Sequence, residues 1–326
     1  MGGGGRSMNA ELWRPGEAWP VARLSHQEWA AFYRAGFRWR ERGGLRVLVD
    51  GPGALRLQSP SRFLAADPPS KRFSWHVYDT LPSTMPVAHD LFLSEGRPVA
   101  VVADSQTAGR GRGQRVWHAA PAGGLNLSLA WEGSDAMFAG ALTLAIGVGV
   151  AEAIRRMTGQ EVGLKWPNDG LIDGRKCFGI IVQAASSPRP RPRLVAGIGV
   201  NVNGEPPAEA GDGAVSLEMA TGEPWSRLAL AVRVASEVAV VLDRWECEGP
   251  GPLLEAWRQR SLTLGRAVVI VDGATEQEGT ALDIAEDGSL RVVLASGAET
   301  RVYAKDVSLR MPPPPAGPAE TPSPTL

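Results

Sequence analysis

The feature that most constrains this chain is an alternation of short β-rich runs and helical patterns between residues 73 and 262. The β-rich runs, which combine branched and apolar residues, cover residues 99–106, 125–131, 162–167, 176–185 and 194–203. Helical periodicity interrupts these runs at about residues 83–95, 137–158 and 226–246. Strands and helices that alternate in this way predict an α/β (α+β) domain.

Composition excludes several classes of protein. With 326 residues and 44% hydrophobic content, the chain can bury one sizeable core and one or two smaller modules. The formal net charge of -1 gives no reason to expect general binding to nucleic acid or to a membrane surface. Cys177 and Cys247 have no paired spacing and the four histidines are scattered, so we expect neither a disulfide framework nor a zinc site.

No targeting or membrane segment is expected. The opening MGGGGRSM is rich in glycine and lacks the apolar region of a secretory signal. The longest uncharged stretch, residues 136–151, is 16 residues long with three glycines, which is short for a membrane span and typical of a buried core helix. Together with the unpaired cysteines, these features predict a cytoplasmic protein.

The amino-terminal segment, residues 1–72, is at most a degenerate or truncated winged-helix-like unit. A helix is predicted over residues 25–42, followed by a hairpin over residues 46–57, which is the order of a winged helix. Only about 24 residues precede this helix, too few for a complete DNA-reading module. On the predicted helix Arg34, Arg38 and Arg42 share one face, but such a stripe is usually solvated surface, so DNA binding is not expected.

Two further units are predicted after the segment of alternating strands and helices, residues 73–262. Residues 263–310 read as four β-rich runs separated by Asp-Gly and Ser-Gly pairs, which predicts a small barrel. Residues 311–326 are rich in proline, carry almost no core-forming side chains and are predicted to be disordered. Between two predicted strands of residues 73–262, residues 186–193 resemble an exposed hairpin tip.

The stretch QTAGRGRGQRVW, residues 106–117, concentrates three glycines and three arginines in one loop. Glycines let backbone N–H groups approach a ligand, and arginines form bidentate bonds with phosphate or carboxylate oxygens. The loop matches neither the phosphate-binding GxxxxGK[ST] pattern nor, with Gln114, the dinucleotide GxGxxG pattern. An anion-binding loop therefore stays open beside an inert surface loop and an RNA-binding Arg-Gly segment.

Other polar positions favour the anion-binding interpretation. In TLPSTM, Ser83 and Thr84 lie where a strand-like run ends and a helix begins, a position at which capping is their commoner role. In KWPND, a turn presents Asn168 and Asp169 at a strand end, and Lys176 starts the next strand. A carboxylate, a lysine and an arginine loop are the groups that phosphate chemistry with a metal ion requires.

Six motifs in one order, STM, QTAGRGRxxRxW, GGLNLSL, KWPND, GRKxxGI and GIGVNVN, resemble those of the biotin protein ligases, also called biotin–[acetyl-CoA-carboxylase] ligases. The resemblance runs from about residue 75 to residue 310. It implies a catalytic domain similar in fold to class II aminoacyl-tRNA synthetases, with a mixed sheet flanked by helices. It also implies that the all-β segment is an SH3-like barrel.

The resemblance implies a reaction in two steps. Biotin and ATP form biotinyl-5′-AMP, and a lysine of the biotin carboxyl carrier protein of acetyl-CoA carboxylase then attacks this adenylate. By similarity Lys176 neutralises charge between the biotin carboxylate and the α-phosphate, and Arg112 and Arg115 hold the phosphates. Asp169 would position the adenylate or its Mg²⁺. The arginine loop would act as a lid that orders over the adenylate and excludes water.

The resemblance also assigns the remaining ligand contacts. Side chains that would bind biotin are those of Ser83, Thr84 and Gln106, and the backbone groups are those of Gly109, Arg110 and Gly111. Contacts to the nucleotide would come from Trp117, Asn168, Asn201 and Arg310. For three of these the alternatives are a hydrophobic anchor at Trp117, a turn role at Asn201 and an exposed strand end at Arg310.

Three departures from the family pattern limit the assignment. Met85 stands where Asn usually follows the Ser-Thr pair, and Gly113 and Gln114 fill the spacer where many members have Gly directly before the last arginine. The short amino-terminal segment argues against repressor activity. A lipoate or octanoyl transfer enzyme of the same fold and a bifunctional ligase and repressor stay as alternatives, and a homodimer is one open oligomeric state.

Overall fold

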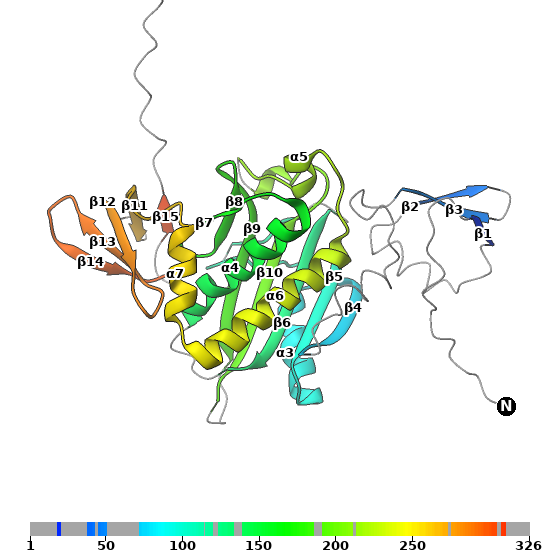
Figure 1. Ribbon diagram of the computed structural model, residues 1–326, viewed down its shortest axis with the longest axis horizontal. Coiled ribbons are helices and arrows are strands. Elements are labelled where there is room, and N and C mark those ends of the chain that lie inside the picture. The colour runs from blue at the N-terminus through cyan, green and yellow to red at the C-terminus, as the bar shows by residue number, and fades with distance from the viewer. Residues whose placement is uncertain are drawn as a thin grey trace, which may run out of the picture.

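A computed structural model gives the structure of the chain. It describes residues 18–20, 38–42, 45–50, 72–113, 115–119, 123–133, 139–185, 191–210, 213–272, 275–304 and 308–310. In Figure 1 a large sheet with helices forms the centre of the molecule, and a smaller sheet at the carboxyl end lies beside it.

The central sheet has seven strands in the order β4-β5-β6-β10-β9-β8-β7. The strands are β4 (Ser74–Leu81), β5 (Val99–Gln106), β6 (Gly124–Glu132), β7 (Gly163–Lys165), β8 (Asp169–Ile172), β9 (Arg175–Ala185) and β10 (Arg193–Asn201). Only β4 and β5 pair in parallel, and the other pairs are antiparallel. The predicted mixed sheet is therefore confirmed, as is the hairpin that joins β9 to β10, although residues 186–190 at its tip lie outside the described residues.

Helices cover both faces of this sheet. The long helices are α3 (Thr84–Glu95), α4 (Ala139–Thr158), α6 (Arg227–Glu248) and α7 (Gly251–Gln259), and the short ones are α5 (Leu217–Thr221) and the 3₁₀ turn η5 (Ala208–Ala210). Along β5, Ala100 and Val102 pack in the core with α4 and α6, whereas Val99 and Val101 pack with α3. Burial on both faces explains why the β-rich runs are almost continuously apolar.

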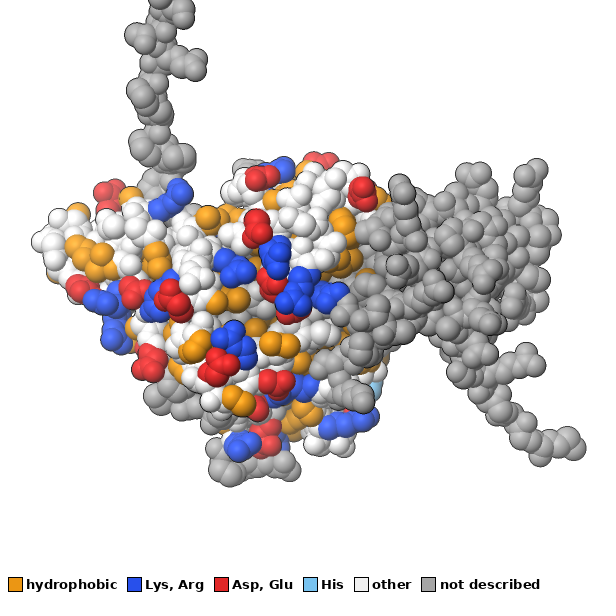
Figure 2. Space-filling view, in the orientation of Figure 1, with side chains coloured by type: hydrophobic (Ala, Val, Ile, Leu, Met, Phe, Trp, Pro, Cys, Tyr) orange, Lys and Arg blue, Asp and Glu red, His pale blue; other side chains and the backbone are white. Residues whose placement is uncertain are grey.

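The stretch predicted as a buried core helix falls mostly within α4, whose Leu144, Ile146 and Val150 are buried. Among the described residues, no helix has both the length and the apolar character needed to span a bilayer. On the surface seen in Figure 2, acidic and basic side chains are interspersed over the helices. Ion pairs among the described residues include that of Arg156 with Glu152 on α4.

The carboxyl-terminal sheet is antiparallel throughout, in the order β14-β13-β12-β11-β15. Its strands are β11 (Ala267–Asp272), β12 (Thr275–Ile284), β13 (Leu290–Leu294), β14 (Glu299–Val302) and β15 (Ser308–Arg310). A turn at Gly288, where φ is +83°, packs so closely on the start of α4 that a Cβ there would overlap the backbone of Ala141. The Trp166 indole donates a hydrogen bond of 3.0 Å to the Gly288 carbonyl oxygen, which ties this sheet to the turn before β8.

The amino-terminal prediction is wrong in part. The strands β1 (Ala18–Pro20), β2 (Arg38–Arg42) and β3 (Leu45–Asp50) form a sheet in the order β1-β3-β2. The end of the predicted helix is therefore a strand, because residues 38–42 pair antiparallel with β3. The first part of the predicted hairpin, residues 46–50, falls in β3. Arg38 and Arg42 belong to β2, so they do not share a helical face. Arg34, residues 51–57 and the tail at 311–326 lie outside the described residues.

Candidate active site

A cavity of about 620 Å³ opens on the face of the central sheet that carries α3. Glycines on β9 and β10 create its floor, because a side chain at these positions would fill the space. A Cβ at Gly199 would overlap the Trp117 indole, and a Cβ at Gly197 would lie 2.7 Å from the Met85 sulfur. The glycines of the GIGVN motif thus leave space for the Trp117 ring and the Met85 thioether against the sheet.

A neutral hydrogen-bonding network forms one end of the cavity. Thr84 Oγ1 lies 2.7 Å from Ser128 Oγ and 3.2 Å from Gln106 Oε1. The Gln106 amide also accepts a 2.8 Å bond from the Thr84 backbone N–H and donates a 3.1 Å bond to Asn126 Oδ1. Ser83, the residue before α3, is buried and makes no side-chain capping bond. The hydroxyls at this helix start therefore do not have the capping role that was the alternative.

The sequence analysis missed two members of this network, Asn126 and Ser128. Both are buried in β6, within the apolar run GGLNLSL. Their spacing of two residues places both side chains on the cavity face of the strand. Two polar residues at alternate positions of an otherwise buried run were the available signal, but only the sheet order brings them beside Gln106.

The glycine-arginine loop is a short hairpin beside the cavity. Arg110 and Val116 form an antiparallel bridge, and the Gly111 N–H donates a 2.7 Å bond to the Arg115 carbonyl oxygen. At its base the Trp117 N–H donates a 3.1 Å bond to the Gly109 carbonyl oxygen. Gly109 has no room for a side chain, since a Cβ would lie 2.5 Å from the Trp117 carbonyl oxygen. The stem is thus folded, and its role as a lid stays a prediction.

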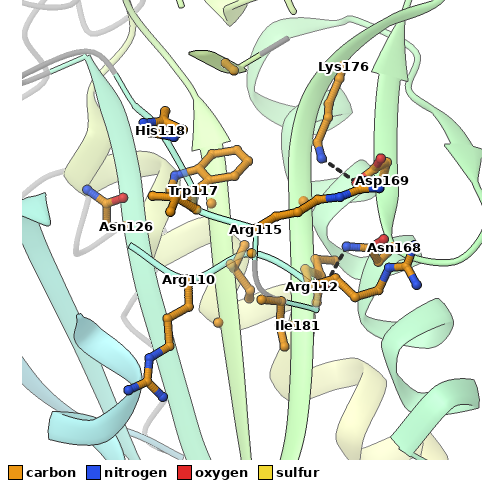
Figure 3. Close-up of a pocket in the computed structure, with 18 of the residues that line it drawn as sticks. Arg110, Arg112, Arg115, Trp117, His118, Asn126, Asn168, Asp169, Lys176 and Ile181 are labelled. Atoms are coloured by element: carbon orange, nitrogen blue, oxygen red, sulfur yellow. Dashed lines mark hydrogen bonds and ion pairs between the residues drawn. The ribbon is translucent and has the colours of Figure 1, made fainter. Parts of the chain in front are cut away.

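Charged side chains gather at the other end of the cavity. Lys176 Nζ lies 2.7 Å from Asp169 Oδ1 and 5.8 Å from the centre of the Trp117 ring. Figure 3 shows the Arg115 side chain extending toward Asp169, whereas the Arg110 guanidinium points away from it. The cavity therefore has a neutral polar end and a charged end, and the Trp117 indole lies near the lysine of the charged end.

Arg112 connects the loop with the carboxyl-terminal sheet. Its guanidinium donates a hydrogen bond to the backbone carbonyl oxygen of Ala304. Burial lowers the pKa of Arg112, and the charge of Arg115 lowers it further, while Asp169 acts in the opposite direction. A guanidinium stays charged under such shifts, so Arg112 is a partly desolvated cation that can bind an anion strongly.

The two asparagines assigned to the nucleotide brace the strands around the charged end. Asn168 Nδ2 donates a 2.9 Å bond to the Ile180 carbonyl oxygen, and Asn201 Nδ2 lies 3.4 Å from the Lys176 carbonyl oxygen. Both still line the cavity. Arg310 ends β15, which pairs with β11, but its side chain lies outside the described part of the structure, so its role stays a prediction.

The structure brings nearly all of the predicted site residues together. Those that line the cavity are Ser83, Thr84, Gln106, Arg110, Gly111, Arg112, Arg115, Trp117, Asn168, Asp169, Lys176 and Asn201. Gly109 does not line the cavity but lies against two residues that do, Gln106 and Trp117. No group of three or more acidic, histidine or cysteine side chains that could hold a metal ion occurs among the described residues.

Two family models match the chain. The model for the biotin/lipoate A/B protein ligase family matches residues 77–203, and that for the biotin protein ligase C terminal domain matches residues 263–310. The first range spans every predicted cavity residue from Ser83 to Asn201.

Characterised relatives and solved structures agree with these models. The bifunctional ligase/repressor BirA of Bacillus subtilis is 32% identical over 80% of this chain and 81% of its own length. The biotin–[acetyl-CoA-carboxylase] ligase of Mycobacterium tuberculosis is 34% identical over 63% of this chain and 76% of its own length. The structure of the Aquifex aeolicus biotin protein ligase in complex with biotin and ATP matches 74% of this chain and 99% of that chain, at 29% identity and a TM-score of 0.61.

Proposed function

The chain belongs to the biotin protein ligase family and is a biotin–[acetyl-CoA-carboxylase] ligase, and we propose that the cavity described above carries both of its half-reactions. The observation that carries this proposal is the contrast between the two ends of the cavity. One end offers neutral hydrogen-bonding groups, and the other offers cations beside a carboxylate. Biotin has the same division, a neutral ureido ring at one end and a carboxylate at the other.

The first half-reaction joins two anions. An oxygen of the biotin carboxylate attacks the α-phosphorus of ATP, the bond to the β-phosphate oxygen breaks, and pyrophosphate leaves. Because the repulsion between the reacting groups is the main barrier, fixed cations are the effective catalysts. We assign this role to Lys176, which is already held in place by Asp169, and assign phosphate binding to Arg112 and Arg115.

Biotin and the nucleotide would lie side by side along the cavity. Its volume of about 620 Å³ is within the range of small-molecule sites, roughly 300–1,000 Å³. Ser83, Thr84, Gln106 and the backbone of residues 109–111 would hold the ureido end. The Trp117 indole, whose Nε1 is buried without a hydrogen-bond partner among the described residues, would cover the adenine or the adenylate.

A magnesium ion fits the charged end only together with ATP. Asp169 is a single carboxylate, and Mg²⁺ in nucleotide sites is commonly held by one or two carboxylates plus the phosphates. We therefore propose Asp169 as its protein ligand. When bound, the ion would neutralise charge on the phosphates, whereas Lys176 and the arginines would act on the α-phosphate and the biotin carboxylate.

In the second half-reaction the acceptor is a lysine of the biotin carboxyl carrier protein. Its neutral amine attacks the acyl carbon of biotinyl-5′-AMP, the amine loses a proton, and AMP leaves. A hairpin that excludes water would protect the adenylate until this lysine arrives. The division into a catalytic unit of residues 73–262 and a small β unit of residues 263–310 belongs to this proposal. The cytoplasmic location stays a prediction.

Pyrophosphate release tests the proposal. With biotin and Mg-ATP, the wild-type protein should release pyrophosphate, and Lys176→Ala should lose about 3 kcal/mol or more of transition-state stabilisation, by analogy with the loss of an oxyanion donor. Biotin binding should change much less. Equal release by the two proteins would refute the catalytic assignment, and release with lipoate instead of biotin would favour the lipoate alternative.

A second function, repression of a biotin operon, is favoured by one observation. The similarity to the bifunctional ligase/repressor of Bacillus subtilis extends over 80% of this chain. A gel shift on biotin-operon DNA, with biotinyl-5′-AMP present and at several salt concentrations, tests it. Sequence-specific retention that survives physiological salt would establish the second function, and its absence would leave the chain with ligase activity alone.

A further inference from the structure

The neutral end of the cavity contains a hydrogen-bond network whose donors and acceptors are fixed by the backbone. At one side the Thr84 N–H lies 2.8 Å from the Gln106 amide, and a backbone N–H can only donate. The facing atom of Gln106 is therefore its oxygen. At the other side Asn126 lies 3.3 Å from the Ala103 carbonyl oxygen, which can only accept, so the facing atom of Asn126 is its nitrogen.

The two constraints give the same orientation at the bond between Gln106 and Asn126. With Gln106 Oε1 turned to Thr84, its nitrogen faces Asn126, and with Asn126 Nδ2 turned to Ala103, its oxygen faces Gln106. The resulting bond from Gln106 Nε2 to Asn126 Oδ1 is 3.1 Å long. If either amide rotated by 180°, two of its contacts would place a donor opposite a donor or an acceptor opposite an acceptor.

The hydroxyl groups follow the same direction. Thr84 Oγ1 lies 3.2 Å from Gln106 Oε1, an acceptor, so its hydrogen is donated there. Ser128 Oγ, 2.7 Å from the same hydroxyl, must then be the donor to Thr84. Donation thus runs from Ser128 through Thr84 and Gln106 to Asn126 and ends on the Ala103 carbonyl oxygen. Each amide keeps one N–H for which the described residues provide no partner.

We propose that Asn126 is a specificity-determining positioning residue, which locks the Gln106 amide so that the cavity presents an N–H donor to the ligand. The inference rests on the proposed function and names the atom that this end selects, the ureido carbonyl oxygen of biotin. Asn126 and Thr84 are almost fully buried, at 3% exposure each, so water cannot easily replace a partner that they lose. A site of this kind rejects ligands that offer a donor at the same place.

The inference distinguishes biotin from 2-iminobiotin, whose ring carries a protonated imine nitrogen in place of the carbonyl oxygen. Wild-type protein should bind biotin far more tightly than the analogue. In Asn126→Ala the Thr84 N–H still holds the Gln106 oxygen, but Gln106 Nε2 loses the acceptor that fixes its position. Its N–H is then no longer held toward the ligand, so biotin affinity should fall about tenfold or more, whereas affinity for the analogue should fall less. The ratio of the two dissociation constants should change by about tenfold.

A second variant and a control complete the test. Gln106→Glu keeps the acceptor for the Thr84 N–H but offers the ligand no donor, so it should shift preference from biotin toward the analogue. Asn203→Ala is the matched control, because Asn203 also bonds a backbone N–H and carbonyl oxygen, those of Trp225, but does not line the cavity. It should leave the ratio unchanged.

Calorimetry on the intact protein, with thermal unfolding of each variant, gives the outcome. A changed ratio in Asn126→Ala, with the control unchanged, supports the proposal, and an unchanged ratio in Gln106→Glu contradicts it, because Gln106 would then not be the donor to the ligand. If both ligands weaken by the same factor in folded Asn126→Ala, Asn126 is merely structural and the proposal is wrong. If the wild-type protein binds no biotin, the proposed function itself fails. This failure differs from a failure of the inference about Asn126, because it is seen in the wild-type protein and not only in the variants.

Discussion

Adding one methyl group at Gly199 should test where Trp117 acts. In the structure a Cβ at Gly199 would lie 2.6 Å from Trp117 Cζ2 and 2.8 Å from its Cδ2, whereas ordinary carbon contacts are about 3.5–4.0 Å. The indole in Gly199→Ala must therefore move by about 1 Å. Overpacking of this kind costs about 1–3 kcal/mol, and a displacement of about 1 Å in an active site can lower the rate roughly 100-fold.

The assay is adenylate formation, followed as pyrophosphate release at varied ATP and saturating biotin. We expect kcat/KM for ATP to fall about 100-fold, equivalent to about 2.7 kcal/mol, while biotin affinity measured without ATP changes much less. Gly179→Ala should have a smaller effect, because its Cβ would lie 3.4 Å from the indole and from Lys176 Nζ. Gly251→Ala adds the same methyl group in open space and is the control. If Gly199→Ala keeps the wild-type ATP dependence, the indole does not cover the nucleotide.

Three further predictions concern the framework around the site. Asp104→Asn should lower the free energy of unfolding by about 3 kcal/mol in a urea titration, because it removes a carboxylate charge that lies 3.1 Å from the buried Arg227 guanidinium. A loss under about 1 kcal/mol would contradict this. Hydrogen bonds from Arg155 and Arg156 lower the pKa of Glu152 from 4.5 to about 2, so the stability that Glu152 contributes is present above pH 4.5 and lost as pH falls toward 2. Glu152→Gln should therefore flatten the dependence of the free energy of unfolding on pH in this range, and an unchanged dependence would refute the prediction. Gly288→Ala should lower the melting temperature more than Gly297→Ala. Both glycines have positive φ, but only the Cβ added at position 288 would overlap backbone atoms, those of Ala141. Equal decreases would mean that the close contact with Ala141 is not needed for stability.

The strands that build the site were predictable where both faces of the sheet are buried. The runs at 99–106, 176–185 and 194–203 match β5, β9 and β10 to within two residues at each end. The prediction at 162–167 was too long, because β7 has three residues and is followed by a turn and by β8, which starts at Asp169. A four-residue strand is too short to carry an alternation that sequence analysis can detect.

The charged end of the cavity was easier to predict than the neutral end. Lys176, Asp169 and the arginines stand out in the sequence, and the structure places the lysine 2.7 Å from the carboxylate. Asn126 and Ser128 are hidden in an apolar strand, and their role depends on partners from β5 and α3 that no local pattern reveals. The prediction of a helix at residues 38–42 was wrong for a related reason, since pairing with β3 determines the conformation there.

The bond between Arg112 and the Ala304 carbonyl oxygen has a consequence for control of the enzyme. A guanidinium assigned to the triphosphate thus also donates a hydrogen bond to the carboxyl-terminal domain, residues 263–310. If Arg112 binds the triphosphate, any movement of that domain that alters this bond, on binding of a carrier or of a second subunit, should change the affinity for ATP. By linkage, ATP should then change the position of the domain by the same free energy. The position of the small β domain would therefore influence how strongly the neighbouring site binds the nucleotide.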